Sequence, residues 1–205
     1  EVICGFGRTG ADFGATTYGI QPQLMSLAKA LSSAYLPVSA AIVTGDIYES
    51  LVEPSAAVGI FGHGYTYGGH PVACAVASKV LEIYERDQLF ARAADTGRYF
   101  QQQLQRFVDH PLVGEVRGVG MIAALELVAN KSSREAFHGN AVGGHCALRA
   151  QEHGLIVRAM GGNSIALCPP LVITQQQVDE LVAKLGKALD DTLRYASDEK
   201  LLSQD

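Results

Sequence analysis

The chain is organised around the stretch SLAKALSSAYLP, residues 26–37, which places one lysine, Lys29, among small and apolar residues. Apolar side chains recur over residues 24–31 at the i, i+3, i+4, i+7 spacing that favours a helix. On such a helix Lys29 lies off the apolar stripe and is an ordinary solvated charge. The alternative is an amine in apolar surroundings, which disfavour its ammonium form. Such an amine forms a Schiff base with an aldehyde cofactor, and the stretch by itself leaves both interpretations open.

Further motifs flank this stretch in a fixed order. They are EVICGFGRTG (1–10), HGYTYGGHP (63–71), VGEVRGVGM (113–121), GLIVR (154–158) and PPLVIT (169–174). In this order and at this spacing the chain closely resembles the class III, pyridoxal-phosphate-dependent aminotransferases, and most closely their omega-amine:pyruvate branch. The motifs cover nearly all of the chain, so the resemblance implies that Lys29 is the Schiff-base lysine of that family.

The first motif also satisfies G-x-G-x-x-G through Gly5, Gly7 and Gly10. A dinucleotide-binding turn of that kind requires a helix opening at its last glycine and an acidic residue about 20 positions further on. The residues that follow include two more glycines and Pro22, and Lys29 stands near the place of the acid. The sequence therefore argues against a nicotinamide cofactor.

The resemblance implies an α/β fold of fold-type I, a class that the alternation of expected strands and helices also favours. In family terms residues 1–84 are the end of the large, mostly parallel-sheet domain that binds the cofactor. Residues 85–205 are the small α+β C-terminal domain. We interpret the opening residues 2–4 as the end of a strand already under way, and the chain as the C-terminal part of a longer one. The family's aspartate beside the pyridine nitrogen would then precede Glu1.

The resemblance also assigns roles to individual residues. Lys29 holds pyridoxal phosphate and is the general base that moves the substrate proton. Val2 packs on the cofactor ring, although a plain core valine is the alternative. Thr66, with Tyr65 beside it, contacts the cofactor phosphate across a dimer interface, where a simple loop threonine is the alternative. Arg158 grips the carboxylate of the keto acid, a contact that suits a guanidinium; a solvated arginine at a strand end is the alternative.

These roles imply a transaminase that takes an amino group from an amine or omega-amino acid donor and gives it to pyruvate or a similar keto acid. The expected assembly is a homodimer with shared active sites. One rival is a decarboxylase, mutase or racemase of the same fold, since such relatives use the same lysine. The other rival is a non-catalytic, truncated remnant that lacks the N-terminal cofactor-binding half. Which amine is the donor does not follow from these residues.

Composition excludes several other classes. With 16 basic and 21 acidic residues the chain has a net charge of −5 and no basic stripe, so we expect no nucleic-acid partner. No apolar run approaches the ~20 residues that span a bilayer. Four scattered cysteines without a C-x-x-C pair suit reduced thiols and a cytoplasmic location. The histidines near residues 138–153 lack the close pairing of metal ligands, so we expect no metal site.

Local patterns predict the remaining elements. We expect a buried strand over residues 38–43, a short helix over 45–53 and a long glycine-containing loop over 54–69. Helices are expected over 70–84, 87–108, 143–153 and from Gln175, with Thr174 as the N-cap of the last. Strands are expected over 113–117, 121–128, 155–158 and 164–167.

Overall fold

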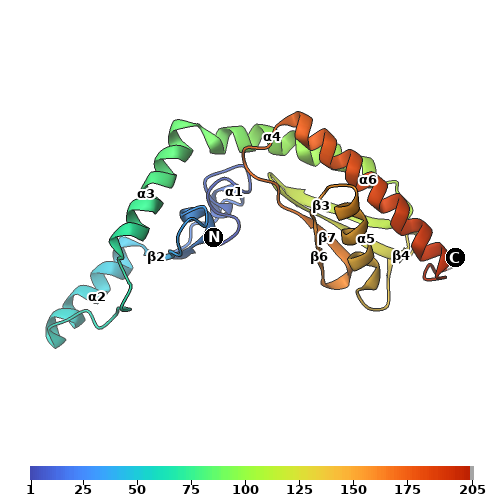
Figure 1. The fold of residues 1–205 in the computed structure, drawn as a ribbon. Helices are drawn as coiled ribbons and strands as arrows, with labels where there is room; N and C mark the ends of the chain where they lie inside the picture. The colour runs from blue at the N-terminus through green and yellow to red at the C-terminus, as the bar shows by residue number, and fades with distance from the viewer. Residues whose placement is uncertain (204–205) are drawn as a thin grey trace. The chain divides into compact units, whose positions relative to one another are not determined.

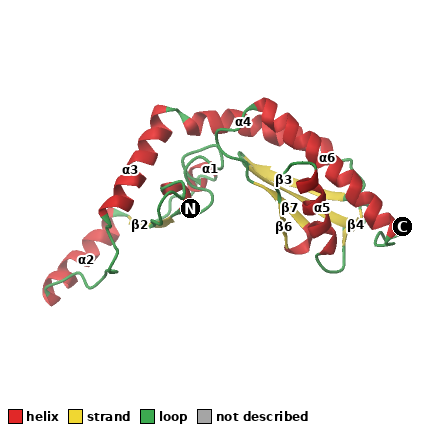
Figure 2. Ribbon diagram, in the orientation of Figure 1, coloured by secondary structure: helices red, strands yellow, loops and turns green. Residues whose placement is uncertain are grey.

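The structure, a computed structural model, describes residues 1–203. The chain divides into two compact units, Glu1–Ala91 and Arg92–Asp205. Figure 1 follows the chain from its N-terminus to its C-terminus, and Figure 2 separates helices from strands. Both units mix helices with strands, as the expected α/β class requires. The assignment of the two units to a large and a small family domain stays a proposal.

The first unit holds helices around one small sheet. Its elements are α1 (Gly14–Thr17), β1 (Leu24–Leu27), the 3-10 helix η1 (Lys29–Leu31), β2 (Ala40–Val43), α2 (Gly45–Val58) and α3 (Pro71–Arg86). β1 pairs antiparallel with β2, so that Leu24 lies opposite Val43 and Leu27 opposite Ala40. The core of this unit is small. It is formed by Phe6, Leu27, Leu31, Ala77, Val80, Tyr84 and Leu89.

Two elements of this unit were expected with the wrong type of secondary structure. The helix predicted over residues 24–31 is instead β1 followed by η1, because residues 24–27 form a ladder with β2 and only Leu27 and Leu31 are buried. Over so short a segment helical spacing does not exclude a strand. The strand expected at residues 2–4 is a run of turns. Its chain reverses there, since the Gly5 nitrogen donates to the Glu1 carbonyl oxygen at 3.2 Å.

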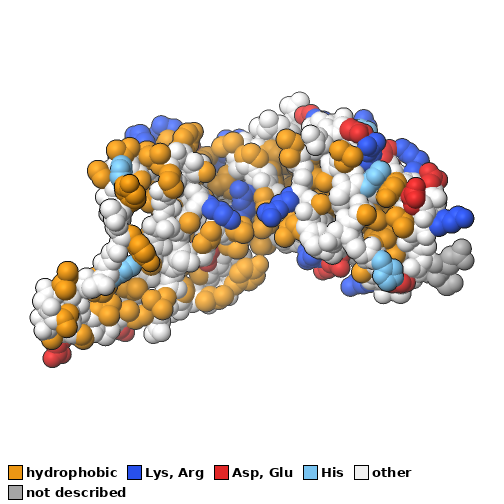
Figure 3. All heavy atoms as spheres, turned by 60° about the horizontal axis from the view of Figure 1, so that its bottom comes forward, with side chains coloured by type: hydrophobic (Ala, Val, Ile, Leu, Met, Phe, Trp, Pro, Cys, Tyr) orange, Lys and Arg blue, Asp and Glu red, His pale blue; other side chains and the backbone are white. Residues whose placement is uncertain are grey.

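The segment 38–58 differs from expectation in exposure and length. The strand β2 is present, but all its residues are exposed rather than buried. The helix α2 runs on through Pro54 to Val58, five residues beyond the predicted end, and none of its residues is buried. On the face drawn in Figure 3, hydrophobic side chains cover much of the surface of this unit. Large exposed members are Ile42, Tyr48, Val52, Val58, Ile60 and Phe61.

The second unit packs helices on one face of an antiparallel sheet. Its elements are η2 (Gln105–Phe107), β3 (Val113–Val119), β4 (Ile122–Asn130), β5 (Glu135–Ala136), α5 (Ala141–Glu152), β6 (Arg158–Met160), η3 (Gly161–Asn163), β7 (Ser164–Leu167) and α6 (Gln175–Asp198), with α4 (Leu89–Leu104) crossing the division. The strand order is β3-β4-β7-β6, and the short β5 pairs with β4. The expected strands at 113–117, 121–128 and 164–167 and the helices at 143–153 and from Gln175 are confirmed in type and place. The strand expected over 155–158 was wrong in place, since β6 shares only Arg158 with it.

The alternation of buried and half-buried residues along β4 shows which face of the sheet lines the core. Along β4, Ala123, Leu125 and Leu127 are buried while Ala124 and Glu126 are half-buried. The buried set packs against the apolar sides of α5 and α6. The opposite face of the sheet carries charged residues. There the Arg117 guanidinium lies 3.0 Å from the Glu115 carboxylate and 2.6 Å from that of Glu126.

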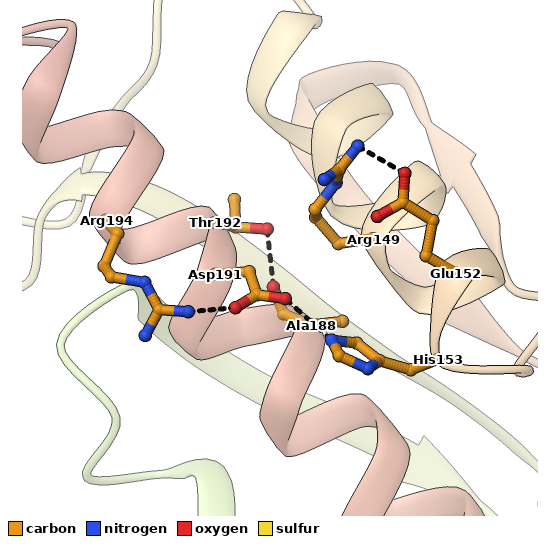
Figure 4. Close-up of polar contacts among 7 residues, drawn as sticks. All are labelled: Arg149, Glu152, His153, Ala188, Asp191, Thr192 and Arg194. Atoms are coloured by element: carbon orange, nitrogen blue, oxygen red, sulfur yellow. Dashed lines mark hydrogen bonds and ion pairs between the residues drawn. The ribbon is translucent and has the colours of Figure 1, made fainter.

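Helix α6 begins at its predicted cap. The Thr174 hydroxyl accepts from the Gln177 nitrogen at 3.2 Å, and the Gln177 side chain accepts from the Thr174 nitrogen at 3.0 Å. This reciprocal pair satisfies two backbone donors that a helix start leaves without a partner. Figure 4 shows further polar contacts along α5 and α6: His153 lies 2.7 Å from Asp191, which also pairs with Arg194. The charges therefore reinforce an interface that is mainly apolar.

Lys131 joins the end of β4 to the turn before β3. Its ammonium donates to the carbonyl oxygens of His110 and Val113 at 2.9 Å each, and to that of Val108. Hydrogen bonds from a charged donor each contribute about 1.5–3 kcal/mol before solvent screening.

We expect Lys131→Met to lower the free energy of unfolding by about 1–3 kcal/mol in urea titrations followed by circular dichroism. Lys187→Met, at an exposed position of α6, is the matched control, and an equal loss in both variants would contradict this role.

None of the helices within residues 1–203 is both long enough and apolar enough to cross a membrane.

Candidate active site

Lys29 lies at a sharp turn directly after β1. Its φ angle is +48°, in the left-handed region that non-glycine residues rarely adopt. Such a backbone costs on the order of 1–3 kcal/mol and persists only where the surroundings fix it. The side chain is exposed, and among residues 1–203 its amine has no hydrogen-bond or ion-pair partner. Lys29 is therefore a free primary amine on a constrained turn.

The residues around Lys29 explain why the turn holds. Leu27 and Leu31, on either side of it, are both buried in the core that α3 completes. The Tyr84 hydroxyl, from α3, donates to the Ala30 carbonyl oxygen at 2.8 Å. Burial raises the pKa of Tyr84 above its ordinary value, so the phenol keeps the proton that it donates. Two apolar anchors and one hydrogen bond thus hold the lysine's backbone while its side chain stays outside the core.

The opening turn brings Val2 to the same part of the first unit. The terminal ammonium on Glu1 donates to the Ser26 carbonyl oxygen at 3.0 Å, so the residue before Val2 lies against β1. The Val2 side chain is 38% exposed, so an apolar surface is available beside this strand. One hydrogen bond therefore joins the segment of Val2 to β1. Its acceptor, Ser26, lies three residues before Lys29.

Thr66 and Tyr65 lie in the loop between α2 and α3. The Gly68 nitrogen donates to the Tyr65 carbonyl oxygen at 2.8 Å, which closes a tight turn around Thr66 and Tyr67. Every residue from Gly59 to His70 is exposed, and Tyr65 is 83% exposed. A Cβ at Gly68 would approach the Tyr65 oxygen to 3.1 Å, so glycine suits this turn. Within residues 1–203 the hydroxyl of Thr66 makes no hydrogen bond to Lys29.

Arg158 begins β6, the edge strand of the second unit. It lies opposite Ala166 of β7. Leu155, Val157 and Ala159 pack toward the core, whereas Arg158 alternates with them and is exposed. Among residues 1–203 its guanidinium has no partner. The side chain is therefore free to bind an anion, and it belongs to the second unit whereas Lys29 belongs to the first.

The side chains present fit pyridoxal phosphate in their chemistry. Lys29 offers an unpaired amine to an aldehyde, and Val2 offers an exposed apolar surface to a ring. Thr66 offers a hydroxyl and a backbone N–H to a phosphate. Sequence reasoning overlooked Glu1 and Tyr84, which hold these segments in place. The glutamate has no motif of its own, and the tyrosine lies 54 positions from its partner.

Comparisons with known proteins agree with this chemistry. The family model described as Aminotransferase class-III matches residues 1–189. Putrescine–pyruvate aminotransferase of Pseudomonas aeruginosa is 48% identical over 193 residues, which cover 94% of this chain and 41% of that protein. Diaminobutyrate–2-oxoglutarate transaminase of Halomonas elongata is 46% identical over 193 residues, with 93% and 41% covered.

A solved transaminase structure is similar to this chain as well. The omega transaminase of Pseudomonas jessenii in complex with PMP matches with a TM-score of 0.92 and 48% identity. The match covers 96% of this chain and 44% of that one. The chain thus spans only about two fifths of the length of the curated relatives that it matches.

Proposed function

The chain belongs to the class-III aminotransferases, and from this membership we propose that the whole protein moves an amino group from an amine or omega-amino acid to pyruvate or a similar keto acid. The family match over residues 1–189 is the observation that carries the proposal. The cofactor of this family is pyridoxal 5′-phosphate, and the relative from Pseudomonas jessenii is described in complex with PMP. The similarity to a putrescine–pyruvate aminotransferase supports an amine donor and pyruvate as acceptor.

Lys29 is the proposed attachment point and general base. Pyridoxal phosphate, when bound, supplies an electron sink that makes the proton on the amine-bearing carbon removable. The Lys29 Nζ would take that proton and deliver it to C4′ of the cofactor within the same half of the reaction, and would move a proton the opposite way in the other half. Positioned proton transfer of this kind contributes roughly 10²–10⁴-fold in rate. The unpaired amine on its constrained turn supports this role.

Arg158 is the proposed carboxylate ligand of the keto acid. Its free guanidinium can form two parallel hydrogen bonds with a carboxylate, a geometry that a lysine does not offer. An amine donor without a carboxylate does not make this contact. For such a donor Arg158 binds the acceptor only.

Thr66 and Tyr65 are proposed to hold the cofactor phosphate of a second copy of the chain. Their loop is exposed throughout, which supports a contact with another molecule. The exposed apolar residues of α2 and of the loop after it support a dimer in the same way. We also propose a cytoplasmic location, which the four free cysteines support.

The proposal is tested by reducing the cofactor-loaded whole protein with borohydride, digesting it and mapping the pyridoxyl mass. We expect the mass on the peptide that contains Lys29. Attachment at Lys79, Lys131 or another lysine would refute the assignment. Consumption of an amine that depends on added pyruvate then separates a transaminase from a decarboxylase, mutase or racemase of the same fold.

The shared site is tested by mixing two inactive proteins, Lys29→Ala and Thr66→Ala. In a mixed dimer one site carries both changes and the other carries neither, because Thr66 serves the partner's Lys29. We expect random mixing to restore roughly a quarter of the wild-type activity, since half of the dimers are mixed and half of their sites are intact. If mixed dimers form and stay inactive, Thr66 does not act across the interface.

A further inference from the structure

We propose that Glu1 is a positioning residue that fixes Val2 relative to Lys29, and that its carboxylate thereby tightens cofactor binding. The inference rests on the proposed function, which places these two residues at the cofactor. Glu1 itself does not touch the cofactor. It acts through the backbone of the two segments that it joins.

The Glu1 carboxylate binds the start of α1 with both oxygens. Oε2 accepts from the Gly14 nitrogen at 3.0 Å, and Oε1 accepts from the Ala15 nitrogen at 2.7 Å. The first N–H groups of a helix have no partner within the helix. Hydrogen bonds to an ionised acceptor are about twice as strong as neutral ones. The side chain is therefore held at two points by one rigid element.

The backbone of Glu1 binds two other segments. Its nitrogen, which is the terminal ammonium of this chain, donates to the Ser26 oxygen in β1 at 3.0 Å; a backbone N–H at the same place can donate to the same oxygen in the whole protein. Its carbonyl oxygen accepts from Gly5 at 3.2 Å. One residue thus connects α1, β1 and the opening turn. Val2 is the next residue along the chain, and Lys29 follows Ser26 by three positions. A shift of Glu1 would change the distance between these two residues.

The fit around Glu1 leaves little space for such a shift. A Cβ on Gly14 would lie 3.2 and 3.3 Å from the two carboxylate oxygens, and 2.9 Å from the Cβ of Cys4. A Cβ on Gly5 would lie 2.7 Å from the Glu1 carbonyl oxygen. The absence of a Cβ at these two glycines therefore leaves room for Glu1. An addition at either position pushes on the same residue.

Glu1→Gln and Gly14→Ala perturb this contact in different ways. The amide of glutamine keeps the shape but sets an N–H donor against a backbone N–H donor, and the alanine methyl group pushes on the carboxylate. In the whole protein we expect each variant to raise the dissociation constant for pyridoxal phosphate about tenfold, because the segment of Val2 is then no longer held at the start of α1. Absorbance titration measures this constant. Hydrogen exchange of the Gly14 and Ala15 amides is expected to rise in Glu1→Gln.

Lys131→Met is the matched control, because it lowers stability without touching the first unit. A merely structural role for Glu1 predicts that Glu1→Gln lowers the melting temperature like the control, with wild-type cofactor affinity. That result would overturn the inference and leave the proposed function intact. Weakened binding in Glu1→Gln and Gly14→Ala, with wild-type binding in Lys131→Met, supports it. A wild-type whole protein that bound no pyridoxal phosphate would instead refute the proposed function, and this inference with it.

Discussion

Lys29→Ala is expected to abolish transamination in the whole protein. The change removes the covalent attachment point and the base together. Loss of the positioned base alone lowers turnover roughly 10²–10⁴-fold. Lysine and alanine both carry a Cβ, so the strained φ of +48° at this position is the same in both proteins. Leu27, Leu31 and Tyr84 still anchor the turn. The expected loss is therefore chemical rather than structural, and initial rates with an amine and pyruvate measure it.

Lys79→Ala is the matched control for this variant. Lys79 lies on α3 of the same unit, is exposed, and pairs with Glu82 at 2.6 Å. An exposed pair of this kind contributes little to stability, so this variant is expected to keep wild-type rates. Added methylamine supplies a diffusible base and is expected to restore part of the rate of Lys29→Ala only. Wild-type turnover in Lys29→Ala would refute the assignment of Lys29 as attachment point and general base.

Arg158→Ala is expected to separate the two substrates. Losing a charge-assisted contact costs about 1.5–3 kcal/mol, or roughly 10–150-fold in affinity for the carboxylate. The KM for pyruvate should rise by that factor, while the KM for an uncharged amine changes little. Arg158→Lys keeps the charge but loses the second hydrogen bond, so its effect should be intermediate. Steady-state kinetics with each substrate varied in turn measure both constants.

The control for Arg158 is Arg98→Ala, which removes an exposed arginine of α4 from its pair with Asp95. Its kinetics should match those of the wild type. Equal losses for pyruvate and the amine in Arg158→Ala would show that this residue supports β6 rather than the ligand. The selectivity between substrates, and not the size of the loss, is thus the decisive result.

The second unit was largely predictable because its local patterns agree with its packing. Thr174 predicts the start of α6, because its cap involves only residues within one helical turn. The strand at 164–167 was predicted with correct bounds, since Ile165 and Leu167 alternate toward a core that this unit buries by itself. By contrast β5 was not predicted. It has only two residues, both exposed, and no apolar alternation marks it.

The first unit was less predictable because distant residues decide its local structure. The segment 24–31 has helical spacing, yet pairing with β2 and burial beneath α3 make it a strand and a 3-10 turn. The motifs indicated the importance of Lys29 without indicating its left-handed backbone. The contacts of Glu1 join positions up to 25 residues apart, which no local pattern encodes.

Under the proposed dimer, the order of α2 depends on association rather than on burial within its own chain. Isolated helices shorter than about 12–15 residues are marginal in water. α2 has 14 residues and none of them is buried. Its local free energy of opening therefore lies at the low end of the range found within proteins. Under the proposed dimer, a second copy that covers α2 stabilises it by mass action. The protection of its amides against exchange then rises with protein concentration, and that dependence reports directly on assembly.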